Sequence, residues 1–307
     1  MRVFLDFSTA PEHQNSGGAL PPSREKIALS TPRTVIGLAS GRGGTGKSTL
    51  AVNLAAAMAL AGRKVGILDA DLNGPSVPAL LGLRPFRVLP MVGGIEPVGA
   101  PLGLRVMAAN LMPDRDEPPV ISFAENQAEP APAAQPGPVE FDYSQTLATL
   151  AGQTRFGAVD LVIIDLAPGL DHLYRAARMI EINGLILVGH PSALSARASR
   201  AAVELMGHVP TPVIGLVENM VGFNCDSCHS VRPLFPVSEI AAGPSELPLL
   251  ARLPFDPRLA ECSGHGTLFV KEYADTPLAR QIIDLARQID QLAITPPLRE
   301  PLSASRP

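Results

Sequence analysis

Short apolar runs alternate along the chain with segments that have the composition of helices. Each run is five to seven residues long and is dominated by Val, Ile and Leu. Helical segments between such runs are typical of βαβ units, so the pattern predicts an α/β fold with a mostly parallel sheet and helices on both faces. The strands predicted in this way cover residues 34–39, 64–69, 159–165, 184–188 and 212–217.

The rest of the pattern indicates a terminal helix and irregular stretches. From Leu278 to Leu292 apolar residues recur every three or four positions, which predicts a helix with one face on the core. Prolines recur among alanines and acidic residues at 113–140, so we expect an insertion there, either a surface excursion or a lid or partner-binding segment. The chain is therefore divided into a flexible N-terminal tail at 1–32, one domain at 33–293 and a C-terminal tail at 294–307.

A glycine-rich segment, SGRGGTGKST at residues 40–49, follows the first predicted strand. It satisfies the pattern G-x-x-x-x-G-K-S of phosphate-binding loops, and an Ala/Leu-rich helical run follows it, as that motif requires. Lys47 is expected to reach the β- and γ-phosphates of a nucleotide, and Ser48 to coordinate Mg²⁺. Backbone N–H groups and the helix N-terminus bind the phosphates in such loops. The predicted nucleotide-binding residues of the loop are Gly41, Arg42, Gly43, Gly44, Thr45, Gly46, Lys47, Ser48 and Thr49.

Acidic side chains stand at the ends of two predicted strands. Asp69 and Asp71 end one strand, and Asp165 ends another. In a parallel sheet all three reach the carboxyl edge, beside the phosphate loop. We expect Asp165 to bind Mg²⁺, directly or through water, and Asp71 to polarise an attacking water. The alternative for each carboxylate is to cap the following helix.

Composition narrows the range of functions. The formal net charge of −4 argues against a general nucleic-acid binder. No run approaches the roughly 18 apolar residues of a membrane-spanning helix, and the first residues lack a long apolar signal core. Three cysteines are too few for a disulfide framework. We therefore expect a cytoplasmic protein without nucleic-acid or membrane partners.

Two of the cysteines, Cys225 and Cys228, form a C-x-x-C pair after the last predicted strand. Both sulfurs can face one metal, but a tetrahedral site or a cluster needs about four ligands, which a symmetric dimer would supply. A zinc ion, a redox disulfide, an empty pair and a c-type haem attachment remain alternatives. The lone Cys262 is expected to be a buried small hydrophobe.

Four segments together resemble the Mrp/ApbC iron-sulfur carrier ATPases, which belong to the deviant Walker A class with MinD and ParA. They are the phosphate loop, LDADLNGPS at 68–76, IIDLAPG at 163–169 and ENM at 218–220. The resemblance spans roughly residues 34–270. The second segment is the most specific, since it separates this branch from generic nucleotidases.

The resemblance implies a P-loop NTPase that binds ATP and Mg²⁺ between two facing subunits. It places Arg42 where the class has a lysine that contacts phosphate in the dimer, and Asn219 where the family reads adenine; a helix cap or turn is the alternative for Asn219. It also implies a 4Fe-4S cluster that bridges a homodimer through Cys225 and Cys228, for transfer to recipient apoproteins. The predicted catalytic residues are Lys47, Asp71 and Arg42.

The sequence departs from the family pattern in four places. Arg42 replaces the signature lysine, and Ala167 replaces the first proline after Asp165. Leu170, Asp171 and His172 replace the small polar residues that normally follow, and a Trp-Arg-Gly-Pro element is absent. Arginine keeps the charge, but its planar guanidinium prefers bidentate pairing. A slow ATPase that carries an iron-sulfur cluster is the leading hypothesis. A MinD/ParA-like positioning or partition switch and a nucleotide-gated scaffold with a zinc-bridged dimer are the alternatives.

Overall fold

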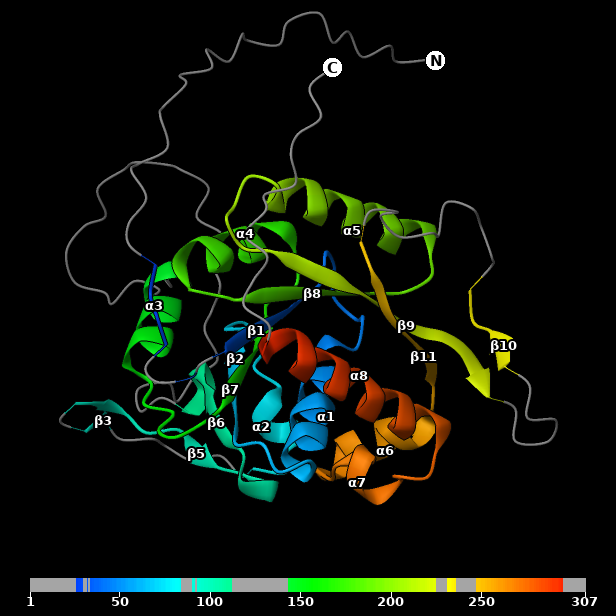
Figure 1. The fold of residues 1–307 in the computed structure, drawn as a ribbon, viewed down its shortest axis with the longest axis horizontal. Coiled ribbons are helices and arrows are strands. Elements are labelled where there is room, and N and C mark those ends of the chain that lie inside the picture. The colour runs from blue at the N-terminus through cyan, green and yellow to red at the C-terminus, as the bar shows by residue number, and fades with distance from the viewer. Residues whose placement is uncertain are drawn as a thin grey trace, which may run out of the picture.

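A computed structural model of the protein describes residues 26–29, 32, 34–83, 90–91, 93–111, 143–224, 231–235 and 247–294. Within these ranges, nine strands form one sheet in the order β10-β9-β8-β1-β7-β2-β6-β5, with β11 also paired to β9 (Figure 1). These strands are β1 (Thr34–Ala39), β2 (Val65–Ala70), β5 (Val98–Gly99), β6 (Arg105–Ala108), β7 (Leu161–Leu166), β8 (Gly184–Gly189), β9 (Val213–Asn224), β10 (Val231–Pro233) and β11 (Leu249–Phe255). A separate hairpin joins β3 (Pro90–Met91) to β4 (Gly94–Ile95).

The sheet is parallel in its centre and antiparallel at two edges. β9, β8, β1, β7, β2 and β6 pair in parallel, whereas β5 and β10 run antiparallel to their neighbours. The five strands predicted from the sequence are the five central ones, so the predicted fold class is confirmed.

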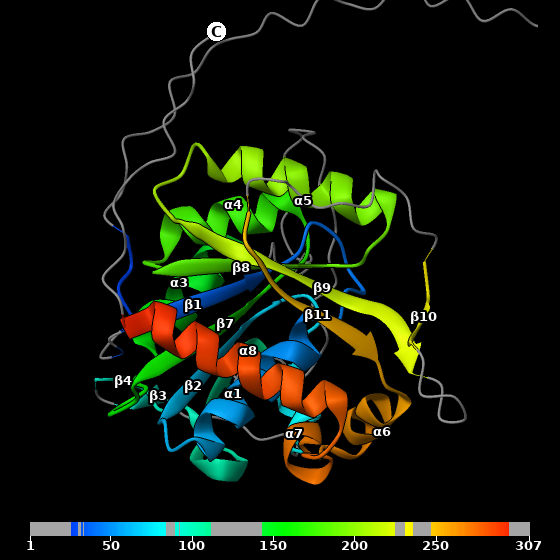
Figure 2. The ribbon, with the colours of Figure 1, turned by 45° about the vertical axis from the view of Figure 1, so that its right-hand side comes forward.

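Helices cover both faces of the sheet (Figures 1 and 2). Side chains alternate along each strand between two apolar clusters; on β1, Ile36 and Leu38 face one cluster, and Val35 and Ala39 face the other. One layer contains α1 (Lys47–Leu60), α2 (Val77–Leu80), α6 (Pro257–His265), α7 (Phe269–Glu272) and α8 (Pro277–Ile294), and the other contains α3 (Tyr143–Gln153), α4 (Leu170–Met179) and α5 (Ala193–Met206). Two short 3₁₀ turns, η1 (Pro101–Gly103) and η2 (Ala109–Leu111), flank β6.

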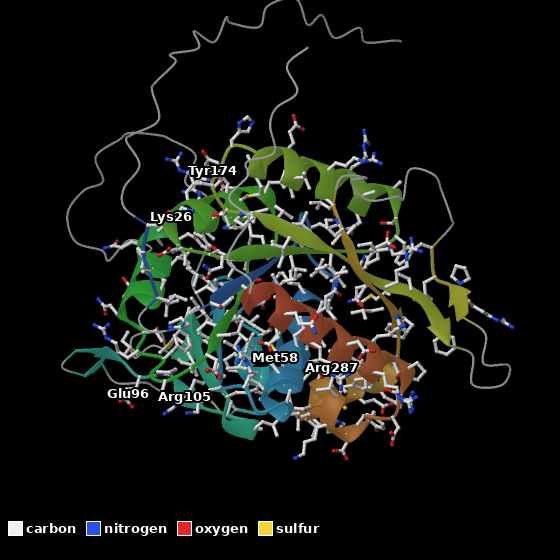
Figure 3. All side chains as sticks on the ribbon, in the orientation of Figure 1. Lys26, Met58, Glu96, Arg105, Tyr174 and Arg287 are labelled. Carbon is white, nitrogen blue, oxygen red and sulfur yellow. The ribbon has the colours of Figure 1, made fainter. Side chains whose placement is uncertain are left out.

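The terminal helix α8 packs on α1, which it separates from solvent. The apolar series predicted for this helix is buried from Leu278 to Ile289, but Leu292 is exposed, because the last turn extends beyond the core. Charged Arg287 lies on the outer side of α8, whereas Met58 of α1 lies inside (Figure 3). None of the helices in the described ranges has the length and hydropathy needed to span a bilayer.

Part of the predicted N-terminal tail belongs to the folded domain. Ile27 forms a parallel bridge with Ile180, and Leu29 is buried. The ammonium group of Lys26 donates to the Thr211 hydroxyl at 2.8 Å. The prediction of a flexible tail is therefore wrong for residues 26–29, because Ile27 pairs with the chain at the end of α4 and Leu29 packs in the core. The predicted insertion at 113–140 lies outside the described residues.

Candidate nucleotide-binding site

The phosphate loop joins β1 to α1 at the carboxyl edge of the sheet. The helix begins at Lys47, and the residue before it, Gly46, has φ 78° and ψ 16°, a left-handed conformation that glycine adopts without a Cβ clash. No side chain caps this helix end among the described residues, and its first turn holds no acidic residue. The first N–H groups of α1 are therefore available to an anion, as the motif predicts.

Two glycines of the loop are required by close packing. A Cβ on Gly41 would lie 2.6 Å from the Cβ of Ala198 on α5, and one on Gly46 would overlap the side-chain amide of Asn219 on β9. The first and last glycines of the motif thus let α5 and β9 approach the loop closely, in addition to the turn geometry expected from the sequence.

Lys47 and Asp165 form an ion pair inside the protein. The lysine is 5 % exposed and the carboxylate 0 % exposed, and Ser48 also hydrogen bonds to Asp165. Burial raises the pKa of Asp165, and the charge of Lys47 opposes that effect. The second carboxylate oxygen, Oδ2, is buried without a hydrogen-bond partner in the described part of the chain. A hard cation prefers such an oxygen, so Ser48 and Asp165 fit the magnesium site that the sequence predicts.

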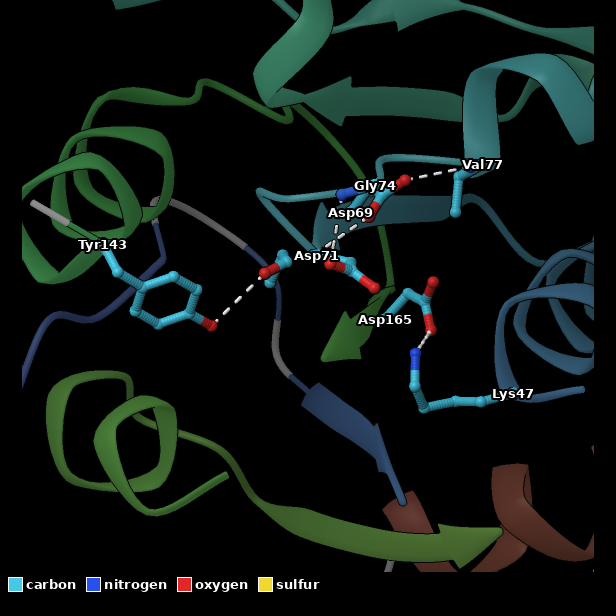
Figure 4. Close-up of polar contacts among 8 residues, drawn as sticks. Lys47, Asp69, Asp71, Gly74, Val77, Tyr143 and Asp165 are labelled. Atoms are coloured by element: carbon cyan, nitrogen blue, oxygen red, sulfur yellow. Dashed lines mark hydrogen bonds and ion pairs between the residues drawn. The ribbon is translucent and has the colours of Figure 1, made fainter. Parts of the chain in front are cut away.

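Asp69 and Asp165 lie opposite each other in the parallel register of β2 and β7. The Asp69 carboxylate accepts the N–H of Val77, the first residue of α2, at 2.9 Å and the N–H of Asp71 at 3.1 Å (Figure 4). Helix capping was the alternative considered for each carboxylate at a strand end, and Asp69 does bind the first N–H group of α2. By accepting the N–H of Asp71, the Asp69 carboxylate also fixes the start of the loop that carries Asp71. The sequence analysis did not predict this role for Asp69.

Burial and the neighbouring Asp165 raise the pKa of Asp69 to about 8. The folded protein therefore retains a proton that the unfolded chain, with a carboxyl pKa of about 4, releases. This proton stabilises the fold fully below about pH 4, and the stabilisation is lost as the pH rises through about 8.

We expect Asp69→Asn to reduce the decline in the free energy of unfolding between about pH 5 and about pH 8. Urea denaturation without Mg²⁺ measures this slope. Asp284→Asn, on the exposed side of α8, is the matched control and should keep the wild-type slope. Equal slopes for the wild type and Asp69→Asn would contradict the assignment of the proton.

Asp71 lies half-buried in the loop after β2. Its carboxylate accepts the N–H of Gly74 at 3.3 Å, which stabilises the turn. Above the loop, the Tyr143 hydroxyl donates to the carbonyl of Ala70 at 3.3 Å (Figure 4), and its ring contacts His172, with 4.5 Å between centroids. Burial first, and Asp71 second, raise the pKa of Tyr143. The structure therefore brings Asp71 to the edge where Asp165 and Lys47 lie.

Asn219 holds the phosphate loop. Its amide nitrogen donates to the carbonyl of Thr45 at 2.8 Å, and its oxygen accepts the N–H of Met220 at 3.0 Å. Beside this contact is a cavity of about 250 Å³. The cavity is lined by Gly46, Thr49 and Asn219, by Pro254 and Phe255 at the end of β11, and by Asp256, which caps α6. Residues 254–256 had no predicted role; Asp256 before Pro257 is a helix-start signal, but only the pairing of β11 with β9 brings it to the loop.

Cys225 and Cys228 lie outside the described residues, but the ends of their segment are placed. Asn224 on β9 and Val231 on β10 are register partners in an antiparallel pair. Among the described residues, no group of three or more His, Cys, Asp or Glu has the arrangement of a metal site. Arg42 is exposed on the phosphate loop, and Cys262 is buried, as predicted.

Comparisons with known proteins identify the family of this chain. A profile of the ParA family, described as NUBPL iron-transfer P-loop NTPase, matches residues 31–290. The iron-sulfur cluster carrier protein of Saccharolobus solfataricus is 33 % identical over 258 residues, which cover 83 % of this chain and 82 % of the relative.

Solved structures show the same fold. The nucleotide-binding protein of Archaeoglobus fulgidus in complex with ADP has a TM-score of 0.60 and 30 % identity, covering 80 % of this chain and 90 % of that one. MinD of Pyrococcus horikoshii complexed with Mg-ADP has a TM-score of 0.57 and 22 % identity, over 85 % of this chain and 97 % of that one. The family profile matches residues 31–290, and the carrier protein of Saccharolobus solfataricus is 33 % identical over most of both chains. The chain therefore belongs to the ParA family of NUBPL-type iron-transfer P-loop NTPases.

Proposed function

We propose that this protein is an ATP-hydrolysing carrier that binds an iron-sulfur cluster at a homodimer interface and transfers it to recipient apoproteins. One observation carries the proposal: β9 connects the two sites. Asn219 in this strand binds the phosphate loop, and the strand ends at Asn224, directly before Cys225 in the sequence. The iron-sulfur carrier among the relatives supports the identity of the cargo.

The charged groups that would bind the nucleotide, Lys47 and Asp165, already lie together at the carboxyl edge of the sheet. Backbone N–H groups of the loop and of α1 bind the phosphates, and Lys47 exchanges its ion pair with Asp165 for the β- and γ-phosphates. Ser48 and the free oxygen of Asp165 hold Mg²⁺, which when bound neutralises charge on the phosphate oxygens. Asp71 orients the attacking water, in a loop anchored by Asp69.

Arg42 supplies the second positive charge of the site. It is exposed on the loop and therefore free to contact phosphate across a dimer interface. Its guanidinium carries a permanent charge and binds two oxygens at once, which suits a phosphate group. The cluster is held by two copies of Cys225 and Cys228, which together provide the four thiolates that a 4Fe-4S cluster takes.

Cluster binding is tested by anaerobic reconstitution with iron and sulfide. We expect broad visible absorbance and about four irons per dimer in the wild type, and loss of both in Cys225→Ala and in Cys228→Ala. Cys262→Ala is the matched control, because this thiol is buried in the core and should not affect the spectrum. Unchanged absorbance and iron content in both C-x-x-C variants would refute the carrier function. Zinc in protein purified without oxygen would support a zinc-bridged dimer instead.

A further inference from the structure

The peptide group between Ala70 and Asp71 helps to set the direction of the Asp71 side chain. Ala70 is the last residue of β2 and pairs with Leu166 of β7, so the chain leaves the sheet at this peptide. A trans peptide unit is planar, and it can turn only through the torsion angles on either side, here ψ of Ala70 and φ of Asp71. Holding this unit therefore limits where the Cα–Cβ bond of Asp71 points.

Both polar groups of this peptide are held by side chains. Its N–H donates to Oδ1 of Asp69 at 3.1 Å, and its carbonyl accepts the hydroxyl of Tyr143 at 3.3 Å (Figure 4). In a trans unit the N–H and C=O bonds point in opposite directions, so the two contacts hold the unit from opposite sides. Tyr143 thus completes the support that Asp69 begins.

Tyr143 is itself held in place by α4. It is the first residue of α3, and its ring contacts the ring of His172, with centroids 4.5 Å apart and planes at 50°. Tilted aromatic rings at this separation attract each other. Burial first, and Asp71 second, raise the pKa of Tyr143, so its hydroxyl stays protonated and remains a donor to Ala70.

His172 lies in the first turn of the helix that follows the magnesium-site carboxylate, Asp165. The residue before this helix, Gly169, donates its N–H to the carbonyl of Ser40 at 3.0 Å, at the start of the phosphate loop. From the sequence, His172 was only a departure from the small polar residues of the family pattern, whereas in the fold its ring reaches Tyr143. The start of α4 therefore joins the phosphate loop to Tyr143.

We propose that Tyr143, supported by His172, is a positioning residue for ATP hydrolysis: its hydroxyl holds the peptide before Asp71 and so keeps the Asp71 carboxylate directed at the attacking water. Tyr143 acts through Asp71, so it affects the rate of the chemical step and not the binding of ATP, which the phosphate loop provides. The proposal rests on the proposed function, since it needs Asp71 to orient that water.

Steady-state phosphate release from Mg-ATP by the full chain tests the role of the hydroxyl. Tyr143→Phe keeps the ring beside His172 and removes only the donor. We expect kcat to fall about 2- to 10-fold, the effect of one neutral hydrogen bond, while KM for ATP stays within about 2-fold of the wild type. His172→Ala should lower kcat by a similar factor, because the Tyr143 ring loses its neighbour, and His172→Phe should recover most of the wild-type kcat.

Tyr174→Phe is the matched control. Tyr174 lies on α4, and its hydroxyl accepts from Arg178 of the same helix, so its removal should leave both kcat and KM at the wild-type values. Urea denaturation checks that each variant is folded under the assay conditions.

Wild-type kcat in Tyr143→Phe or in His172→Ala would overturn the proposal, as would a loss of kcat that is matched by an equal rise in KM. A wild type that releases no phosphate would refute the ATPase and this proposal together. A lowered kcat in Tyr143→Phe, in a protein that binds no cluster on reconstitution, would support the positioning role and refute the carrier function.

Discussion

Replacing Lys47 by Ala is expected to lower ATP hydrolysis by about 100- to 1,000-fold, the effect of removing one charge-stabilising donor from a phosphate site. The same change should lower the free energy of unfolding by about 3–5 kcal/mol, because the fully buried Asp165 loses its ion-pair partner. Phosphate release and urea denaturation measure the two effects separately. Lys64→Ala, an exposed lysine just before β2, is the control and should change neither.

A double variant separates the catalytic effect from the structural one. Lys47→Ala with Asp165→Asn removes both charges, so most of the lost stability should return while hydrolysis stays no higher than in Lys47→Ala. Recovery of hydrolysis in the double variant would mean that Lys47 acts only through the stability of the fold. Equal phosphate release from the wild type and Lys47→Ala would contradict an ATPase that uses this loop.

The glycines of the phosphate loop should differ sharply in their tolerance of alanine. Gly46 has φ 78° and its Cβ would overlap Asn219, whereas Gly44 has the same φ but open space around it. Gly43 has neither constraint. We expect Gly46→Ala to cost about 2–4 kcal/mol, the sum of a left-handed backbone and an overpacked contact. Gly44→Ala should cost about 1–2 kcal/mol and Gly43→Ala less than about 0.5 kcal/mol.

Urea denaturation without nucleotide measures this series, so that effects on phosphate binding do not enter. Gly43→Ala is the matched control, since it adds the same methyl group to the same loop. If Gly46→Ala were no less stable than Gly44→Ala, the contact between Asn219 and the loop would not contribute to stability. Asn219 would then not hold the phosphate loop in place, as its hydrogen bond to Thr45 suggests.

Local patterns predicted the central strands well because each one is apolar and is buried on both faces. The predicted strand at 34–39 coincides with β1, and β2 and β7 begin one or two residues later than expected. β9 continues to Asn224, well beyond the predicted end at 217, through Glu218 and Asn219. These polar residues interrupt the apolar pattern, but each has a partner, Arg252 for the carboxylate and the Thr45 carbonyl for the amide.

β11 was not predicted at all. Arg252 and Pro254 break its apolar run, and neither periodicity nor composition identifies it as a strand. It forms because it pairs with β9 at one side of the sheet. The end of this strand, Pro254 and Phe255, and the following Asp256 line the cavity beside the phosphate loop. A contributor to the candidate site was therefore missed because its position depends on a pairing between distant segments.

The sequence by itself determined the phosphate loop with its lysine and serine, since the turn, the helix start and the ligand chemistry are all local to about ten residues. It also indicated the family, through four short segments that can each be read locally. Only the tertiary structure decided which distant groups meet there. The order of β9, β8, β1, β7 and β2 places Asp69 opposite Asp165 and brings Asn219 to Thr45. Strand order arises from packing across the whole sheet, because each pairing joins segments that lie far apart in the sequence, and a local pattern of hydrophobic and polar residues does not specify which strand is the neighbour.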